Sequence, residues 1–226
     1  MEAEQKMGPG FARFCALGLP PSALIKNGGI PHMTKHSSPI LSIAVAAVVG
    51  AAYAVLTIAL APISYAAVQL RVSEARCILP YFFPGTAWGL FAGCFLANLI
   101  TGNIFDILFG SLATLFAGLI TAWLGQPARR ALADPGVASL DAHTYIPGQL
   151  LACFMPVVFN AVIVGAVITG AYEGMNIFRH FGLFAVNGAW VGLGELIVLY
   201  VIGFPLMRYL PTLKSFRDFV NKVNAK

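Results

Sequence analysis

The stretch that decides the fold is Pro62–Asp106, PISYAAVQLRVSEARCILPYFFPGTAWGLFAGCFLANLITGNIFD, which lies between two strongly apolar segments. It carries Arg71, Glu74, Arg76 and Asp106, four of only 23 charged side chains in the chain. Ionisable groups at membrane depth are costly and are usually kept for a function. Arg71 and Glu74 are three residues apart, so on a helix they share a face and can pair. The stretch therefore indicates either a substrate or ion site at a membrane surface or a salt bridge that anchors a helix end.

The composition places the chain in a bilayer. Of its 226 residues, 58% are apolar and 10% are charged, and the mean hydropathy is +0.80. Soluble domains carry about 25% charged residues. Long apolar runs without strict alternation predict helices rather than a β-barrel, because backbone groups in hydrocarbon need internal hydrogen-bond partners. The four cysteines, Cys15, Cys77, Cys94 and Cys153, form no C-x-x-C pair, which favours buried thiols over disulfides or a metal site.

The apolar runs divide the chain into three parts. Residues 1–39 contain five prolines and are predicted to be an N-terminal cytoplasmic tail, or an upstream extension that ends before a start at Met33. Residues 40–207 form the transmembrane domain, and residues 208–226 form a basic cytoplasmic C-terminal tail. The clear spans are 40–61, 104–124, 148–171 and 183–207. Between the first two, 68–82 and 85–100 are either one kinked span or two short ones, since Phe83-Pro84-Gly85 separates them.

The distribution of basic residues decides between five spans and six. With six spans, the tail before Ile40, the loop 126–147 and the C-terminus share one side and hold 11 of the 14 Lys and Arg residues. The opposite side holds only Arg71, Arg76 and Arg179. Because cytoplasmic loops are enriched in Lys and Arg, we predict a compact all-α bundle of six transmembrane helices with both termini in the cytoplasm.

This topology brings polar residues together in the outer half of the bundle. The candidate substrate-binding residues are Arg71, Glu74, Asn98, Asp106, Asn160 and Glu195. The first four fall at outer ends of spans, whereas Asn160 and Glu195 lie roughly 15 Å deep. A carboxylate near the midplane is penalised by about 3 kcal/mol on insertion scales. We therefore predict an outward-opening cavity with Asn160 and Glu195 at its floor; a structural hydrogen bond between helices is the alternative for Glu195.

Small residues recur along the first span. Ser42, Ala46, Gly50 and Ala54 are spaced four apart, with Ala47 and Ala51 beside them. Such stripes let two helices approach closely. The stripe predicts either a docking surface for a partner protein at Ala46, Ala47, Gly50 and Ala51 or packing within the same bundle.

Several function classes lack their motifs in this sequence. No Gly-Lys-Ser/Thr occurs, so the chain has no Walker A loop and cannot hydrolyse ATP by that route. Neither H-E-x-x-H nor G-x-S-x-G occurs, and basic patches with interleaved aromatic residues are absent. We therefore expect neither an enzyme nor a nucleic-acid-binding protein, and we expect no cofactor.

A series of short motifs runs in order through residues 40–207. They are Ala61-Pro-Ile-Ser-Tyr65, Gln69-Leu-Arg-Val-Ser-Glu-Ala75, Leu79-Pro80, Gly89-Leu-Phe-Ala-Gly-Cys-Phe-Leu-Ala-Asn98, Asp106-Ile-Leu-Phe-Gly-Ser-Leu-Ala-Thr114, Phe159-Asn160 and Gly194-Glu-Leu-Ile-Val198. Together they resemble the queuosine-precursor transporter (QueT-type) family. Arg76-Cys77 departs from the family pattern, in which small or apolar residues are expected, and leaves room for a shifted substrate.

The resemblance implies a substrate-binding subunit, or S-component, of an energy-coupling-factor (ECF) importer in a bacterial plasma membrane. Such six-helix subunits dock on a shared transmembrane subunit and two ATPase subunits, which hydrolyse the ATP. The implied cargo is a 7-deazaguanine such as preQ1, preQ0 or queuine. The residues alone leave open an autonomous channel, a facilitator or a secondary transporter, which would work without ATPase partners.

The implied cargo gives the candidate residues individual roles. A 7-deazaguanine presents a ring N–H and an exocyclic amino group side by side, and this pair matches the two oxygens of a carboxylate. We assign this edge to Glu195 and the remaining polar atoms to Asn160. Asp106 or Glu74 would bind the aminomethyl cation of preQ1, and Arg71 would act as a gate or hold Glu74.

Overall fold

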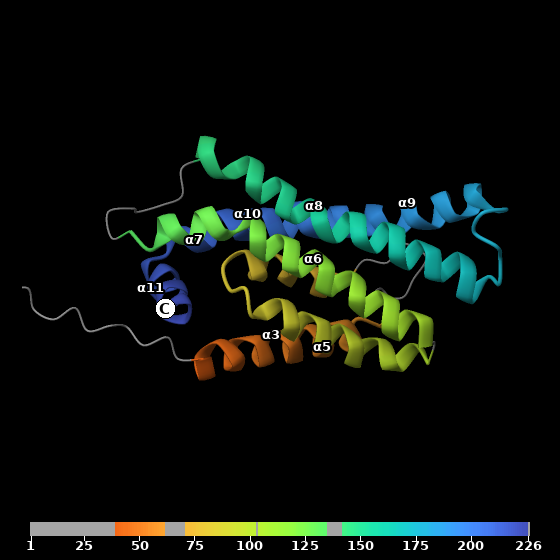
Figure 1. Ribbon diagram of the computed structural model, residues 1–226, viewed down its shortest axis with the longest axis horizontal. Coiled ribbons are helices and arrows are strands. Elements are labelled where there is room, and N and C mark those ends of the chain that lie inside the picture. The colour runs from red at the N-terminus through yellow and green to blue at the C-terminus, as the bar shows by residue number, and fades with distance from the viewer. Residues whose placement is uncertain (1–38, 62–70, 103, 135–141, 226) are drawn as a thin grey trace, which may run out of the picture. The chain divides into compact units, whose positions relative to one another are not determined.

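The computed structural model describes residues 39–61, 71–102, 104–134 and 142–225 of the chain (Figure 1). In these ranges all regular structure is helical. Four helical stretches are long and apolar enough to cross a membrane: Pro39–Ala59, Asp106–Leu124, Tyr145–Ala171 and Phe181–Thr212. The prediction of an all-α protein of the membrane is therefore confirmed. Of the predicted N-terminal tail, 1–39, only Pro39 lies within the described residues.

The helical elements follow one another with few interruptions. In chain order they are α3 (Pro39–Ala59), η1 (Val72–Tyr81), α5 (Thr86–Asn98), η2 (Leu99–Thr101), η3 (Asp106–Gly110), α6 (Ser111–Leu124), α7 (Gln126–Leu132), α8 (Ala142–Val167), η4 (Ile168–Tyr172), α9 (Phe181–Val198), η5 (Leu199–Gly203), α10 (Phe204–Tyr209), η6 (Leu210–Thr212) and α11 (Lys214–Asn224). The segments η3, η4 and η5 are π-helical turns that continue a neighbouring α-helix.

Two segments are shorter than the predicted spans 68–82 and 85–100. The 10 residues of η1 form a 3₁₀-helix that rises about 20 Å, and the 13 residues of α5 also rise about 20 Å. Both fall short of the roughly 30 Å of hydrocarbon in a bilayer. Pro84 and Gly85 lie in the turn between them, so the two segments are separate. By length, four of the described helices are full spans, and the predicted count of six requires η1 and α5 to cross as shorter segments.

Contacts between α3, η1 and α5 fix their directions. A Cβ built on Gly89 would lie 2.0 Å from the backbone oxygen of Ala46, and one built on Gly93 would lie 2.3 Å from that of Gly50. Residue numbers rise together across this pair, so α3 and α5 are parallel. Hydrogen bonds from Tyr53 to Glu74 and from Thr57 to Ser73 run in the opposite order, so η1 is antiparallel to α3.

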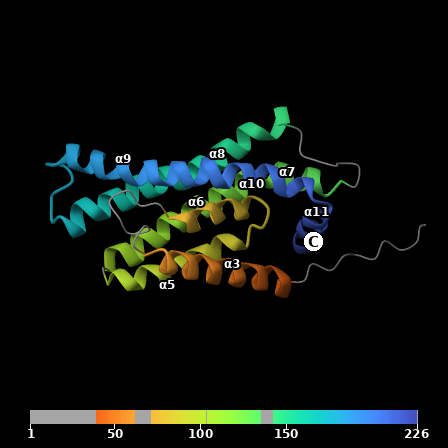
Figure 2. The same cartoon turned by 180° about the vertical axis from the view of Figure 1, so that it is seen from behind.

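The remaining neighbours are antiparallel in turn. In each neighbouring pair, residue numbers rise along one helix as they fall along the other. Between α5 and α6 the contacting residues are Asn98–Asp106 and Ala87–Gly118. Between α6 and α8 they are Thr121–Ala152 and Phe116–Phe159, and between α8 and α9 they are Asn160–Glu195 and Thr169–Asn187. The six segments α3, η1, α5, α6, α8 and α9 therefore alternate in direction. As a result, the start of α3 and the helix α11 lie at the same end of the bundle (Figures 1 and 2).

The small-residue stripe of α3 is divided between two faces. Ala46 and Gly50 pack against α5 so closely that a Cβ on Gly50 would lie 2.3 Å from the backbone oxygen of Gly89. For these two residues the structure favours packing within the bundle and corrects their assignment to a docking surface. Ala47 and Ala51 are exposed on another face of the helix.

The residues predicted as a basic C-terminal tail include a helix that packs on the bundle. In α11, Val220 and Val223 are buried, and the ring of Phe216 lies 5.2 Å from that of Phe82. The side-chain amide of Asn224 donates to the backbone oxygen of Phe82, and that of Asn221 donates to the backbone oxygen of Leu132. This packing covers the turn that follows η1.

Candidate functional site

All six candidate substrate-binding residues are buried. The exposed fractions are 3% for Arg71, 0% for Glu74, 0% for Asn98, 4% for Asp106, 2% for Asn160 and 2% for Glu195. They come from five separate elements. Arg71 directly precedes η1, which contains Glu74, and the other four residues lie one each in α5, η3, α8 and α9. Charged side chains are almost never fully buried unless they have partners, so the contacts of each residue decide what the cluster can do.

Glu195 and Asn160 are direct neighbours across the α8–α9 interface. The Asn160 amide donates a hydrogen bond of 2.8 Å to Oε1 of Glu195. Oε2 of Glu195 is buried and accepts no hydrogen bond from any described residue. A buried acceptor without a donor costs about 1–3 kcal/mol, or more for a charged group. The Glu195 carboxylate therefore keeps an acceptor oxygen that no described residue uses.

Glu74 has a different environment. The Tyr53 hydroxyl donates to its Oε1, and the Cys77 thiol donates to its Oε2 across 2.7 Å. One turn further along α3, the Thr57 hydroxyl donates to the Ser73 hydroxyl across 2.6 Å. These contacts fasten the first turn of η1 to one face of α3.

Arg71 connects the carboxylates of the cluster. It interacts electrostatically with Asp106 and Glu74, and Glu195 interacts with both Arg71 and Glu74. The Asn98 amide donates to the backbone oxygen of Asp106 across 3.2 Å. The structure thus brings the six predicted residues into one electrostatically connected group. Asp106 lies in the first turns of its helix, where the helix dipole favours a carboxylate.

Sequence reasoning missed two members of this group, Tyr53 and Cys77. The signal for Tyr53 was present, because Tyr53 and Thr57 are the only hydroxyl-bearing side chains in 43–59 and lie four residues apart on one helix face. Tyr65, the last residue of the first family motif, lies outside the described residues. Trp190 is 47% exposed on the bundle surface, and it is Tyr53 that reaches the cluster.

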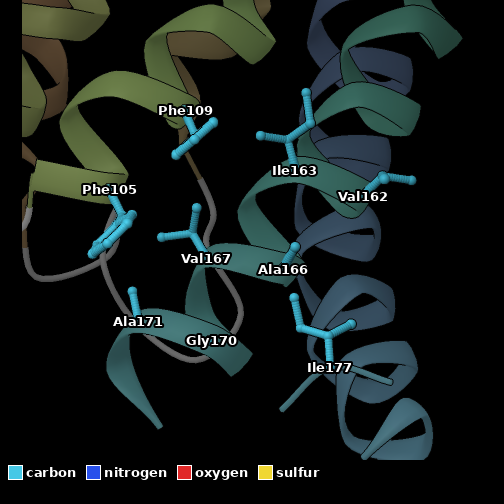
Figure 3. A pocket seen from close by; sticks show the side chains of 9 residues that line it. All are labelled: Phe105, Phe109, Val162, Ile163, Ala166, Val167, Gly170, Ala171 and Ile177. Atoms are coloured by element: carbon cyan, nitrogen blue, oxygen red, sulfur yellow. The ribbon is translucent and has the colours of Figure 1, made fainter. Parts of the chain in front are cut away.

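A separate groove of about 520 Å³ lies between the η3 segment and the end of α8 with η4 (Figure 3). Its lining is entirely apolar: Phe105, Phe109, Val162, Ile163, Ala166, Val167, Gly170, Ala171 and Ile177. None of the six candidate residues lines it. The exposed Phe and Val side chains of its walls belong to helices that can span a bilayer, so this groove suits hydrocarbon rather than a polar heterocycle.

The thiols in the described part of the chain are all free and buried: Cys77, Cys94 and Cys153. This agrees with the predicted buried thiols, and Cys15 lies outside the described residues. The same part of the chain contains no group of three His, Cys, Asp or Glu side chains arranged to hold a metal ion.

Residues 43–212 match the QueT transporter family, a match that covers well over half of the chain. The chain belongs to the QueT transporter family. No curated protein and no solved structure matches it. A QueT transporter is not an enzyme, and its apolar helices make it a multi-pass membrane protein. All six candidate residues of this QueT transporter lie inside the matched region, whereas α11 lies beyond it.

Proposed function

We propose that this QueT transporter is the substrate-binding S-component of an ECF importer and that its cargo is a 7-deazaguanine such as preQ1, preQ0 or queuine. The observation that carries the proposal is the buried Oε2 of Glu195, which has no donor among the described residues. Buried acceptors of native proteins nearly always have a partner. A ligand that brings N–H donors to this oxygen would supply the missing partner.

The chemistry of the cluster supports this cargo class. Oε1 of Glu195 already accepts one bond from Asn160 but keeps a second lone pair, so the carboxylate can still receive two adjacent N–H donors. The ring N–H and exocyclic amino group of a deazaguanine form such a pair. The Asn160 amide would meet the remaining polar atoms, and the buried carboxylate of Asp106 or of Glu74 would bind the aminomethyl cation of preQ1.

We also propose six membrane passes with both termini in the cytoplasm. The alternation of α3, η1, α5, α6, α8 and α9 supports this topology, because it leaves the start of α3 and the helix α11 at one end. Among the described residues, the basic side chains of α7 and α11 lie at that same end, as expected for a cytoplasmic side (Figure 1). The short segments η1 and α5 then cross the bilayer with their polar ends buried among the longer helices. The candidate cluster would lie in the outer half, and the membrane would be the bacterial plasma membrane.

Docking on the transmembrane subunit of the importer would use the exposed face of α3. Ala47 and Ala51 present small side chains there, with Ile43, Val48 and Val55 exposed beside them. Small residues among aliphatic ones allow close helix packing in a membrane. The two ATPase subunits of the complex would supply the energy.

Isothermal titration of the purified protein with preQ1, preQ0 and queuine tests the cargo, with guanine as the comparison. Saturable binding of at least one deazaguanine is expected, and its complete absence would contradict the proposed cargo class. Uptake in cells with and without the ECF partner subunits tests the mechanism. Uptake without partners would instead favour an autonomous facilitator or a secondary transporter.

A further inference from the structure

The short helix η1 leaves one of its faces partly uncovered. The Thr57 hydroxyl of α3 binds Ser73, and a Cβ built on Gly203 of η5 would lie 3.1 Å from Ile78, so η1 is held between these two elements. Figure 2 shows the gold segment η1 between α3 and α9, on the side of the bundle that faces the viewer. The residues of η1 that are only half-buried are Val72, Arg76 and Leu79. The uncovered face of η1 therefore consists of these two apolar residues and one cation.

Arg76 has no partner in the described part of the chain. No hydrogen bond or ion pair joins its side chain to a described residue. Arg129 shows how this fold satisfies another half-buried guanidinium, because its two terminal nitrogens donate to the backbone oxygens of Tyr81 and Ala122. Arg76 lacks such acceptors, although a guanidinium carries five N–H donors and is always charged. The uncovered face of η1 therefore presents an unsatisfied cation.

The position of Arg76 along the bundle is at hydrocarbon depth. Six residues separate it from Phe82, which contacts α11 at one end of the bundle, so Arg76 lies roughly 12 Å inside that end. Glu74, two residues earlier, binds Tyr53, which lies roughly 20 Å along α3 from Pro39. Charges at such depth are costly and nearly always have a partner. Lipid phosphates lie outside the hydrocarbon, so the anion that can be placed at this depth is a protein carboxylate.

A second copy of the chain does not offer such a carboxylate among its described residues. The carboxylates within the spans and η1 are all buried: Glu74, Asp106 and Glu195. The exposed carboxylates lie in connections between helices or in α11: Asp134, Glu173 and Asp218. The anion for Arg76 must therefore come from a different membrane protein.

We propose that the uncovered face of η1 docks a transmembrane helix of the importer's transmembrane subunit and that an Asp or Glu of that helix binds Arg76. The carboxylate neutralises the guanidinium and accepts two of its N–H groups at once. Val72 and Leu79 pack against apolar residues of the same helix. Because η1 lies beside α3, this contact extends the docking surface proposed at Ala47 and Ala51. The inference rests on the proposed function, which supplies the transmembrane subunit.

The test is the dissociation constant between the full-length protein and the transmembrane subunit with its two ATPase subunits, encoded in the same genome and purified in detergent without added lipid. In Arg76→Met this constant should rise about tenfold or more, which is the effect of losing a hydrogen bond between charged groups. Arg76→Lys keeps the charge and should recover part of the affinity. Arg179→Met is the matched control, because Arg179 is exposed in the connection before α9 and lies outside the uncovered face of η1.

The isolated Arg76→Met variant should unfold at the parent temperature or above and should bind cargo with parental affinity, since no described residue depends on Arg76. A variant that does not fold, or that unfolds at a lower temperature, would show an internal role for Arg76 and overturn the inference. Parental affinity of Arg76→Met for the partner complex would overturn it as well. An affinity loss that appears only after anionic lipid is added would assign the anion to a lipid and reject the carboxylate.

Charge exchange identifies the carboxylate. Arg76→Glu should bind the partner complex poorly, and replacement of one membrane-embedded Asp or Glu of the transmembrane subunit by Arg should restore its binding. If no such replacement restores binding, the proposed ion pair does not exist. If the parent protein itself does not bind the partner complex, the proposed function fails, whereas a parent that binds and an unaffected Arg76→Met variant reject this inference alone.

Discussion

The side-chain amide of Asn160 donates to Oε1 of Glu195 across 2.8 Å, and this bond joins α8 to α9 at a point where both residues are buried. The bond fixes the carboxylate while its second oxygen keeps its capacity to accept. Two polar residues that are 35 positions apart in sequence thereby form a fixed pair, which we propose as one half of the cargo site.

The first prediction concerns Glu195→Gln, which keeps the shape of the side chain but replaces one acceptor oxygen with a donor. Deazaguanine binding should weaken by about 2 kcal/mol or more, because a donor of the cargo would then face a donor of the protein. Glu173→Gln is the control, since Glu173 is exposed and contacts Asn187 rather than the cluster. If titration gave parental affinity for Glu195→Gln, the group around Arg71 and Asp106 would become the leading site.

The second prediction concerns the contact between α3 and α5. Gly50→Ala should lower the unfolding temperature, because the new Cβ would lie 2.3 Å from the backbone oxygen of Gly89. Overpacking of this kind typically costs about 1–3 kcal/mol. Gly182→Ala serves as the comparison, since nothing lies within 4 Å of a Cβ built there. Equal unfolding temperatures for both variants would show that the two helices separate more easily than the structure indicates.

The third prediction concerns the exposed face of the same helix, which carries Ala47 and Ala51. Ala51→Leu should leave folding and cargo binding intact, because the side chain is exposed. Uptake into cells should nevertheless fall, since added bulk would hold the partner helix away. Loss of binding together with uptake would place Ala51 inside the fold. Normal uptake would remove this face of α3 as a docking surface.

The fourth prediction concerns topology. A thiol introduced at the exposed Glu173 should react with an impermeant maleimide applied to intact cells, whereas one introduced at the exposed Lys222 should react only after lysis. The three described native thiols are buried and should contribute little background. Labelling of Lys222→Cys from outside would reverse the orientation of the whole bundle.

The fifth prediction concerns α11. Asn224→Ala removes a donor to the backbone oxygen of Phe82 and should lower the free energy of unfolding by about 1–3 kcal/mol. Lys222→Ala, at an exposed position of the same helix, should have little effect. Chemical or thermal denaturation in detergent measures both. A stable Asn224→Ala variant would mean that α11 adds little to the fold.

Much of the fold could be predicted from the positions and lengths of the apolar runs in the sequence alone. The four long helices follow the runs 40–61, 104–124, 148–171 and 183–207, because an uninterrupted apolar run can satisfy its backbone only as a helix. The short segment η1 was harder to define, since Pro80 lies inside it and Pro84 follows it. Hydropathy does not distinguish a ten-residue 3₁₀-helix from part of a longer span.

The candidate residues were predictable, but most of their partners were not. Burial of Glu195 and Asn160 follows from the rarity of polar side chains in an apolar run. The pairing of Tyr53 with Glu74 depends on how two helices are offset along their axes, and no local pattern encodes that offset. For the stripe of α3, the matching positions Gly85, Gly89 and Gly93 do recur every four residues in the sequence. Only the structure shows that these two stripes meet.

The contact between α3 and α5 also restricts the route of a transported molecule. Where Ala46 and Gly50 of α3 meet Gly89 and Gly93 of α5, the two backbones approach so closely that there is no space for side chains between them. A planar heterocycle or a lipid tail therefore cannot pass through this seam. Tyr53 lies one turn beyond Gly50 on the same helix, so one side of the cluster is attached to this closed wall. Any opening that admits or releases cargo must come from movement of the other helices against a fixed α3–α5 pair.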